Sequence, residues 1–220
     1  MLDSKEISRR IKGFARFLVE TAAMLRKVHR WTQYSEIPDA ERETVETHSL
    51  TTLWLTAAML AVERAAGNTA PNGERIILGA SLHDAGEGET GDVAYKVKID
   101  PRIRAILRQI ELEAVQKMFG SLPDPVRELF LDAYAVEDEV GKTLDGDFFN
   151  GVERIGYIMF AVPQVKKGRN SLIEVFERQH PEIMKLAERF ISVRIFYEPY
   201  REYVEAKLAE RATLRTSVDD

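Results

Sequence analysis

Apolar residues recur at helical spacing along almost the whole chain. Near the N-terminus, one stripe is formed by Ile7, Ile11, Phe14, Leu18, Leu25 and Val28. A period of three to four residues predicts an amphipathic helix, and Ser4 is a suitable residue to cap its start. The polar segment 32–43 interrupts this pattern, so we expect a loop there.

The same periodicity predicts further helices over about 44–66, 74–84, 101–119, 125–138, 146–165 and 181–211. The segment 67–73, "GNTAPNG", is rich in turn-forming residues, and Pro101 suits the first turn of a helix. The sequence has no long strand-like alternation and no internal repeat. We therefore predict an all-α fold, a single domain over 1–220 with a helical core at about 4–170 and a long helical C-terminal extension at about 171–212.

Composition narrows the chemistry that this fold can carry. Apolar residues make up 45% of the chain, which is typical of globular proteins. Cysteine is absent, so there is no disulfide and no thiolate ligand. Any metal must be held by His, Asp or Glu, a set that suits Co, Mn, Zn, Ni, Fe or Mg.

Charge and hydropathy exclude two classes of partner. The net charge of −5 argues against binding to a nucleic acid polymer, which requires a basic surface. The apolar runs are too short to span a bilayer, and the N-terminus "MLDSKEISRR" lacks the apolar region of a signal peptide. We expect a cytoplasmic protein without a membrane segment.

The segment "SLHDAGEGETGD" at 81–92 places a histidine among several carboxylates, directly after an apolar helix. It is either a solvated turn or one wall of a metal site. Ile76, Ile77, Leu78 and Leu82 predict that the helix is buried. A buried, ionised Asp84 costs several kcal/mol unless it is paired or bound to a metal, which favours the metal site.

Other candidates for the same site lie nearby in sequence or precede it. Glu87 follows His83 by one helical turn and could exchange protons with water, although most loop glutamates are simply solvated. His48 lies inside a predicted helix, where a histidine is more often a packing residue than a ligand.

Arg30 and Trp31 are expected to close the first helix. Such a pair most often forms an amphipathic helix end, in which the tryptophan packs against the core. Alternatively, the arginine grips a phosphate and the tryptophan covers a flat ring. Lys96 and Lys98 are the nearest positive charges after the acidic segment.

Together these motifs resemble a known family. "RW" at 30–31, "THS" at 47–49, "HDAGEGETGD" at 83–92 and Lys98 follow one another as in the HD-domain phosphohydrolase superfamily, and most closely as in its bacterial 5'-deoxynucleotidase-like branch. The resemblance covers roughly residues 12–170.

The resemblance implies one divalent metal ion held by His48, His83 and Asp84. The family has a further Asp ligand in a later helix, and in the matching stretch "FFNGVERIGYIMF" this chain has Glu153. Asp145 and Asp147 are the nearby substitutes. The extra methylene of Glu153 shifts its carboxylate, so the fourth ligand departs from the family pattern.

The resemblance also implies roles in catalysis and substrate binding. Glu87 would be the catalytic acid or base, acting beside Asp84. Substrate contacts are implied for Arg30, Trp31, Asp92 and Lys98, with Asp92 on a sugar hydroxyl.

The function implied is release of phosphate from deoxynucleoside 5'-monophosphates. One alternative is a deoxynucleoside triphosphate hydrolase, which would need more positive charge than the acidic loop supplies. Another is a catalytically weakened nucleotide-binding protein, which Glu153 favours. A two-metal phosphodiesterase fits less well, because no histidine lies between His83 and His180. We expect a homodimer or a higher homo-oligomer.

Overall fold

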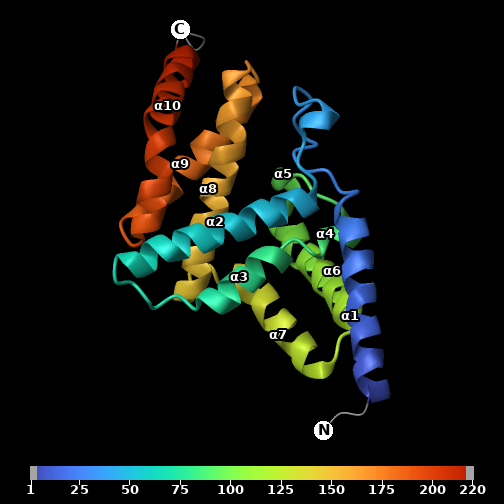
Figure 1. Cartoon of the computed structure of the whole chain (residues 1–220). Coiled ribbons are helices and arrows are strands. Elements are labelled where there is room, and N and C mark those ends of the chain that lie inside the picture. Colours follow the sequence, from blue (N-terminus) through green and yellow to red (C-terminus); the bar gives the residue numbers. More distant parts are fainter. Residues whose placement is uncertain (1–3, 217–220) are drawn as a thin grey trace. The chain divides into compact units, whose positions relative to one another are not determined.

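The computed structural model describes residues 4–216, and its regular secondary structure in this range is helical (Figure 1). Its helices are α1 (Ser4–Leu25), α2 (Val45–Ala65), α3 (Gly73–Leu82), α4 (Glu87–Thr90), α5 (Tyr95–Lys98), α6 (Pro101–Phe119), α7 (Asp124–Tyr134), α8 (Leu144–Lys166), α9 (Ile173–Ala187) and α10 (Ile191–Thr216), with short 3-10 helices at Asp39–Glu41, Ala135–Glu139 and Asn170–Leu172. Between residues 4 and 216 the extended backbone amounts to one isolated antiparallel bridge, His29 to Thr44. The predicted all-α class is confirmed.

The chain forms two compact units, each made of two stretches of sequence. One unit contains the chain up to Leu53 together with Ile77–Glu137, and the other contains Trp54–Ile76 together with the chain from Asp138 onward. Helices α2 and α3 each begin in one unit and end in the other. A single domain over 1–220 stays a prediction.

The first unit packs α1, α4 and α6 against one another, and α6 also contacts α5 and α7. Its core is a cluster of Phe17, Leu82, Ala85, Val115, Phe119, Leu122, Ala133 and Tyr134. The rings of Phe17 and Phe119 meet edge to face, with their centroids 5.6 Å apart. Because Leu82 and Ala85 belong to this core, the two residues between them, His83 and Asp84, are held on a rigid base.

The first helix differs from its prediction. It ends at Leu25, and its core-facing side carries Phe17, Thr21 and Leu25, whereas Ile11, Phe14 and Leu18 are exposed. The predicted stripe was therefore right for Leu25 and wrong for Ile11, Phe14 and Leu18, because contact with α4 and α6 selects a neighbouring face of the helix. Ser4, which was predicted to cap this helix, is instead its first residue. The side chain of Ile7 lies outside the described residues.

The acidic segment after α3 is buried, so it is not a solvated turn. Residues 82–87 are all buried, and Glu87 opens the short helix α4. The predicted burial is confirmed for Ile76 and Leu82, whereas Ile77 and Leu78 are half-buried. The predicted start of the next helix at Pro101 is also confirmed, with Asp100 accepting a hydrogen bond of 2.9 Å from the backbone N–H of Arg102.

The second unit packs α8, α9 and α10 against one another (Figure 1). The single helix predicted over 181–211 is wrong, since α9 ends at Ala187 and α10 begins at Ile191. A buried carboxylate explains the new start. Oε1 of Glu63 accepts hydrogen bonds from the backbone N–H and the hydroxyl of Ser192, at 2.8 and 2.7 Å. A long-range cap of this kind leaves no signal in the local sequence.

In the described part of the chain, no helix is both long and apolar enough to cross a membrane.

Candidate metal centre

Three residues predicted as metal ligands come together in the first unit. His48 lies in the first turn of α2, and His83 and Asp84 directly follow α3. The Nε2 atoms of the two histidines are 3.2 Å apart, and Oδ2 of Asp84 lies 3.5 Å from Nε2 of His48 and 3.2 Å from that of His83. All three side chains are buried.

This cluster fits a divalent metal ion. Each residue offers one ligand atom, and the three atoms lie within 4.8 Å of one another. Nδ1 of His83 lies 3.0 Å from the carbonyl oxygen of Ala80, so it donates its proton there and leaves Nε2 as a lone-pair donor. Two imidazoles and a carboxylate form a donor set that suits the transition metals and Mg.

Arg30 lies inside this cluster. One of its guanidinium nitrogens contacts Oδ2 of Asp84 and lies 3.7 Å from Oε2 of Glu87. Burial alone would raise the pKa of Asp84, but its electrostatic and hydrogen-bond interactions with His83, Arg30 and His48 outweigh burial and hold this pKa well below its usual range. Asp84 is therefore an ionised carboxylate, as a metal ligand must be.

Glu87 is buried beside Asp84, but its pKa is shifted in the opposite direction. Its Oε1 is contacted by the ammonium of Lys98 from α5. Burial and the negative charge of Asp84 raise the pKa of Glu87 to about 8, against the opposing effect of Arg30 and Lys98. For Lys98, burial is outweighed by Glu87 and Asp84, so its pKa is raised. A carboxyl with a pKa near neutrality suits proton transfer.

Trp31 and Asp92 contact each other at the edge of the site. The backbone N–H of Trp31 donates to Oδ2 of Asp92 at 3.1 Å, and the indole N–H donates to Oε2 of Glu43 at 2.9 Å. Trp31 has a φ of 65°, which is the left-handed region. For a bulky residue this conformation costs on the order of 1–3 kcal/mol, so its surroundings hold it in place.

Glu153, the predicted fourth ligand, lies in α8 of the second unit. It is buried, and its Oε2 accepts a hydrogen bond of 2.8 Å from the hydroxyl of Tyr157. The two nearby substitutes bind the backbone instead: Asp145 accepts from the N–H of Asn72 and Asp147 from that of Gly141. Ligation by Glu153 stays a prediction.

The sequence analysis missed two carboxylates near the cluster. Glu43 precedes α2 and lies 4.0 Å from Nδ1 of His48. Glu111 lies in α6, and a Cβ built on Gly86 would approach its Cβ to 2.8 Å. Burial raises the pKa of Glu111, and the charge of Asp84 adds to this effect. Neither residue stands at a ligand spacing from the histidines, so no motif pointed to them. Lys96 is exposed, unlike Lys98.

Comparison with known proteins gives the family. The family model for 5'-deoxynucleotidase YfbR-like proteins matches residues 17–204. A 5'-deoxynucleotidase from Citrobacter koseri and a 5'-deoxynucleotidase YfbR from Escherichia coli are each 32% identical over 119 residues, which are 52% of this chain and 58% of theirs. The matched stretch thus spans a little over half the length of these curated relatives.

Solved structures agree on the fold. An HD-domain phosphohydrolase from Listeria innocua superposes with a TM-score of 0.71 at 16% identity, covering 94% of this chain and 99% of its own. A protein described as a predicted metal-dependent phosphohydrolase from Magnetospirillum magnetotacticum gives 0.61 at 19% identity, covering 97% of both chains. The family model extends over most of the chain and includes the residues of the buried cluster, so this protein belongs to the YfbR-like 5'-deoxynucleotidase family.

Proposed function

We propose that this protein is a metal-dependent phosphomonoesterase that releases phosphate from deoxynucleoside 5'-monophosphates. The observation that carries the proposal is the buried cluster of His48, His83 and Asp84, in contact with the guanidinium of Arg30. A set of metal ligands beside a buried arginine suits a phosphate group, whose oxygens bind to both.

One divalent ion is the proposed cofactor, with Co, Mn, Zn, Ni, Fe and Mg as candidates. His48, His83 and Asp84 would hold it, and Glu153 would be the fourth ligand. Bound there, the ion supplies positive charge at the phosphate and a more acidic water.

The protein's own residues then divide the remaining work. Arg30 binds two phosphate oxygens with its planar guanidinium, and Lys98 holds Glu87 beside the phosphate. Glu87 exchanges a proton at Oε2, which accepts no hydrogen bond from the described residues. Trp31 covers the nucleoside and excludes water, while Asp92 contacts a sugar hydroxyl with its remaining acceptor capacity.

The decisive experiment is a phosphate-release screen of the purified protein over nucleoside and deoxynucleoside monophosphates, each with several divalent metals. We expect phosphate from deoxynucleoside 5'-monophosphates only when metal is present. Release of triphosphate from deoxynucleoside triphosphates would replace the proposal with the triphosphate hydrolase. Absence of both products, in a protein that binds nucleotide, would indicate the catalytically weakened form.

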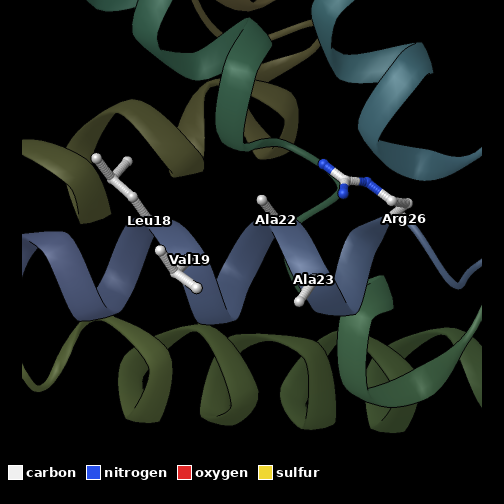
Figure 2. Close-up of a pocket in the computed structure, with 5 residues that line it drawn as sticks. All are labelled: Leu18, Val19, Ala22, Ala23 and Arg26. Atoms are coloured by element: carbon white, nitrogen blue, oxygen red, sulfur yellow. The ribbon is translucent and has the colours of Figure 1, made fainter.

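We also propose that the protein is a homodimer. The exposed face of α1 carries Ile11, Phe14, Leu18 and Val19, with exposed fractions of 39% to 70%. A shallow groove on this helix is lined by Leu18, Val19, Ala22, Ala23 and Arg26 (Figure 2). Contiguous apolar side chains in water favour association.

Sedimentation of single variants tests the dimer. Val19→Asp should shift the protein to the monomer, whereas Leu214→Asp, an equally exposed leucine on α10, should leave its mass unchanged. A monomeric wild-type protein would end this part of the proposal.

A further inference from the structure

Glu43 lies between Trp31, a proposed substrate contact, and His48, a proposed metal ligand. The chain brings it there through the isolated bridge that follows α1. The backbone carbonyl of Glu43 accepts a hydrogen bond of 2.8 Å from the N–H of Arg30, and the N–H of Val45 donates to the carbonyl of Val28 at 2.9 Å. These backbone bonds fix Glu43 next to Arg30 and Trp31.

One oxygen of the Glu43 side chain faces two site residues. Oε2 accepts the indole N–H of Trp31 at 2.9 Å and lies 4.0 Å from Nδ1 of His48. The first contact is a hydrogen bond to a charged acceptor, and the second is a longer electrostatic contact. A single carboxylate oxygen therefore touches Trp31 and stabilises one side of His48.

The contact with His48 bears on which ring nitrogen carries the proton. Nε2 of His48 faces His83 and Asp84, so it is the nitrogen available to a metal. The proton must then be on Nδ1, and a carboxylate opposite Nδ1–H favours that tautomer and orients the ring.

The contact with Trp31 bears on a strained backbone. Trp31 holds a left-handed φ of 65°, which an aromatic residue adopts only when its surroundings enforce it. Glu43 fixes the indole and Asp92 fixes the backbone N–H of the same residue. Removal of the Glu43 carboxylate would take away this hydrogen bond to the indole of Trp31.

We propose that Glu43 is a positioning residue that orients the metal ligand His48 and the nucleoside-facing Trp31 with the same carboxylate oxygen. The inference rests on the proposed function only in naming what the two residues bind. Its consequence is that the loss of one side chain, that of Glu43, should change both the affinity for metal and the environment of the Trp31 ring.

The experiment uses Trp54→Phe as background, because the chain has two tryptophans and Trp54 is 64% exposed. The remaining fluorescence then reports on Trp31, which is 7% exposed. Glu43→Ala and Glu43→Gln are compared for Trp31 emission and acrylamide quenching, and for Co²⁺ affinity by calorimetry. The matched control is Glu46→Gln, a nearby carboxylate that pairs with Arg26 instead.

The two variants should separate the two contacts. Glu43→Ala loses both, so Trp31 emission should shift to the red and Co²⁺ affinity should fall about 10- to 100-fold. Glu43→Gln keeps an acceptor for the indole and loses the charge, so emission should match the background while affinity falls. Glu46→Gln should change neither property.

Two results would overturn the inference. Unchanged Co²⁺ affinity in Glu43→Gln would show that the carboxylate does not act on His48. Unchanged emission in Glu43→Ala would show that it does not hold Trp31. If Glu43→Ala does not fold, the emission of Glu43→Asp, whose shorter side chain also leaves Trp31, takes its place. If the Trp54→Phe protein neither binds Co²⁺ nor releases phosphate, the result counts against the proposed function. The emission of Glu43→Ala still decides whether Glu43 holds Trp31.

Discussion

The guanidinium of Arg30 contacts Oδ2 of Asp84, although 54 residues separate them in the chain. The same oxygen faces Nε2 of both His48 and His83. One carboxylate oxygen is thus shared between an arginine and the proposed metal ligands. Any change at Arg30 therefore tests whether it serves the phosphate or only balances the charge of Asp84.

We expect Arg30→Lys to raise the KM for deoxynucleoside monophosphates by roughly ten- to a hundredfold, because lysine loses one of two charge-assisted hydrogen bonds. Metal content should stay at the wild-type level. Steady-state kinetics and atomic emission measure both, with Arg26→Lys as the control at an exposed position. Wild-type kinetics in Arg30→Lys would make this arginine a structural partner of Asp84.

His83→Ala should abolish metal binding and leave the fold helical. Its imidazole is the central member of the cluster, within 3.2 Å of both other ligand atoms. Atomic emission of the purified variant measures the metal, and far-ultraviolet circular dichroism measures the helices. Metal retained at wild-type stoichiometry would show that the ligands lie elsewhere.

Glu87→Gln should lower kcat by about 10²- to 10⁴-fold, because the amide cannot exchange a proton. The KM and metal content should change little, since the amide has nearly the same shape. A matched substitution at Glu89, the exposed acid of the same short helix, should leave kcat unchanged. Equal turnover in Glu87→Gln and wild type would assign the proton transfer to another group.

The stability of the metal-free protein should depend on pH through Glu87. Its pKa is raised from 4.5 to about 8 on folding, so between these values the folded protein retains a proton that the unfolded chain has lost. This contribution is fully present below pH 4.5 and is lost as the pH rises toward about 8.

Urea unfolding across this pH range measures the effect. The free energy of unfolding should fall more steeply with pH in wild type than in Glu87→Gln, which does not titrate there. Each unit of pKa difference corresponds to about 1.4 kcal/mol. Parallel curves for the two proteins would contradict the raised pKa.

Gly86→Ala should destabilise the protein. The new Cβ would lie 2.8 Å from Cβ and 3.1 Å from Cα of Glu111, so α6 must move away from the acidic segment. Overpacking of this kind typically costs about 1–3 kcal/mol. In contrast, Gly156→Ala in α8 meets no atom within 4 Å and should stabilise the helix slightly. Urea unfolding of both variants compares them directly.

Local pattern was sufficient for much of the fold and for bringing several candidate residues to attention. The helix that starts at Pro101 and the burial of Ile76 and Leu82 follow from short-range spacing. His83, Asp84 and Glu87 were identified because they stand together in one motif. Arg30, His48 and Lys98 were candidates with a commoner structural explanation, and the resemblance to the family favoured their functional roles.

What the sequence could not supply depends on long-range contact. Contacts with α4 and α6 determine which face of α1 is buried. The sequence around Phe17 and Thr21 does not indicate that these two residues lie on that face. Glu43 contacts the indole N–H of Trp31, whose left-handed φ is not indicated by the local sequence. The end of α9 at Ala187 has no glycine or proline beside it.

The cap that Glu63 provides for α10 has a consequence for synthesis. Glu63 and Ser192 are 129 residues apart. At about 5–20 residues per second, translation separates them by roughly 6–26 s. During that interval the carboxylate has no serine to bind, although Asn68, whose side chain donates to Oε2 at 2.7 Å, is already present. The second unit therefore completes its fold only after Ser192 has been synthesised.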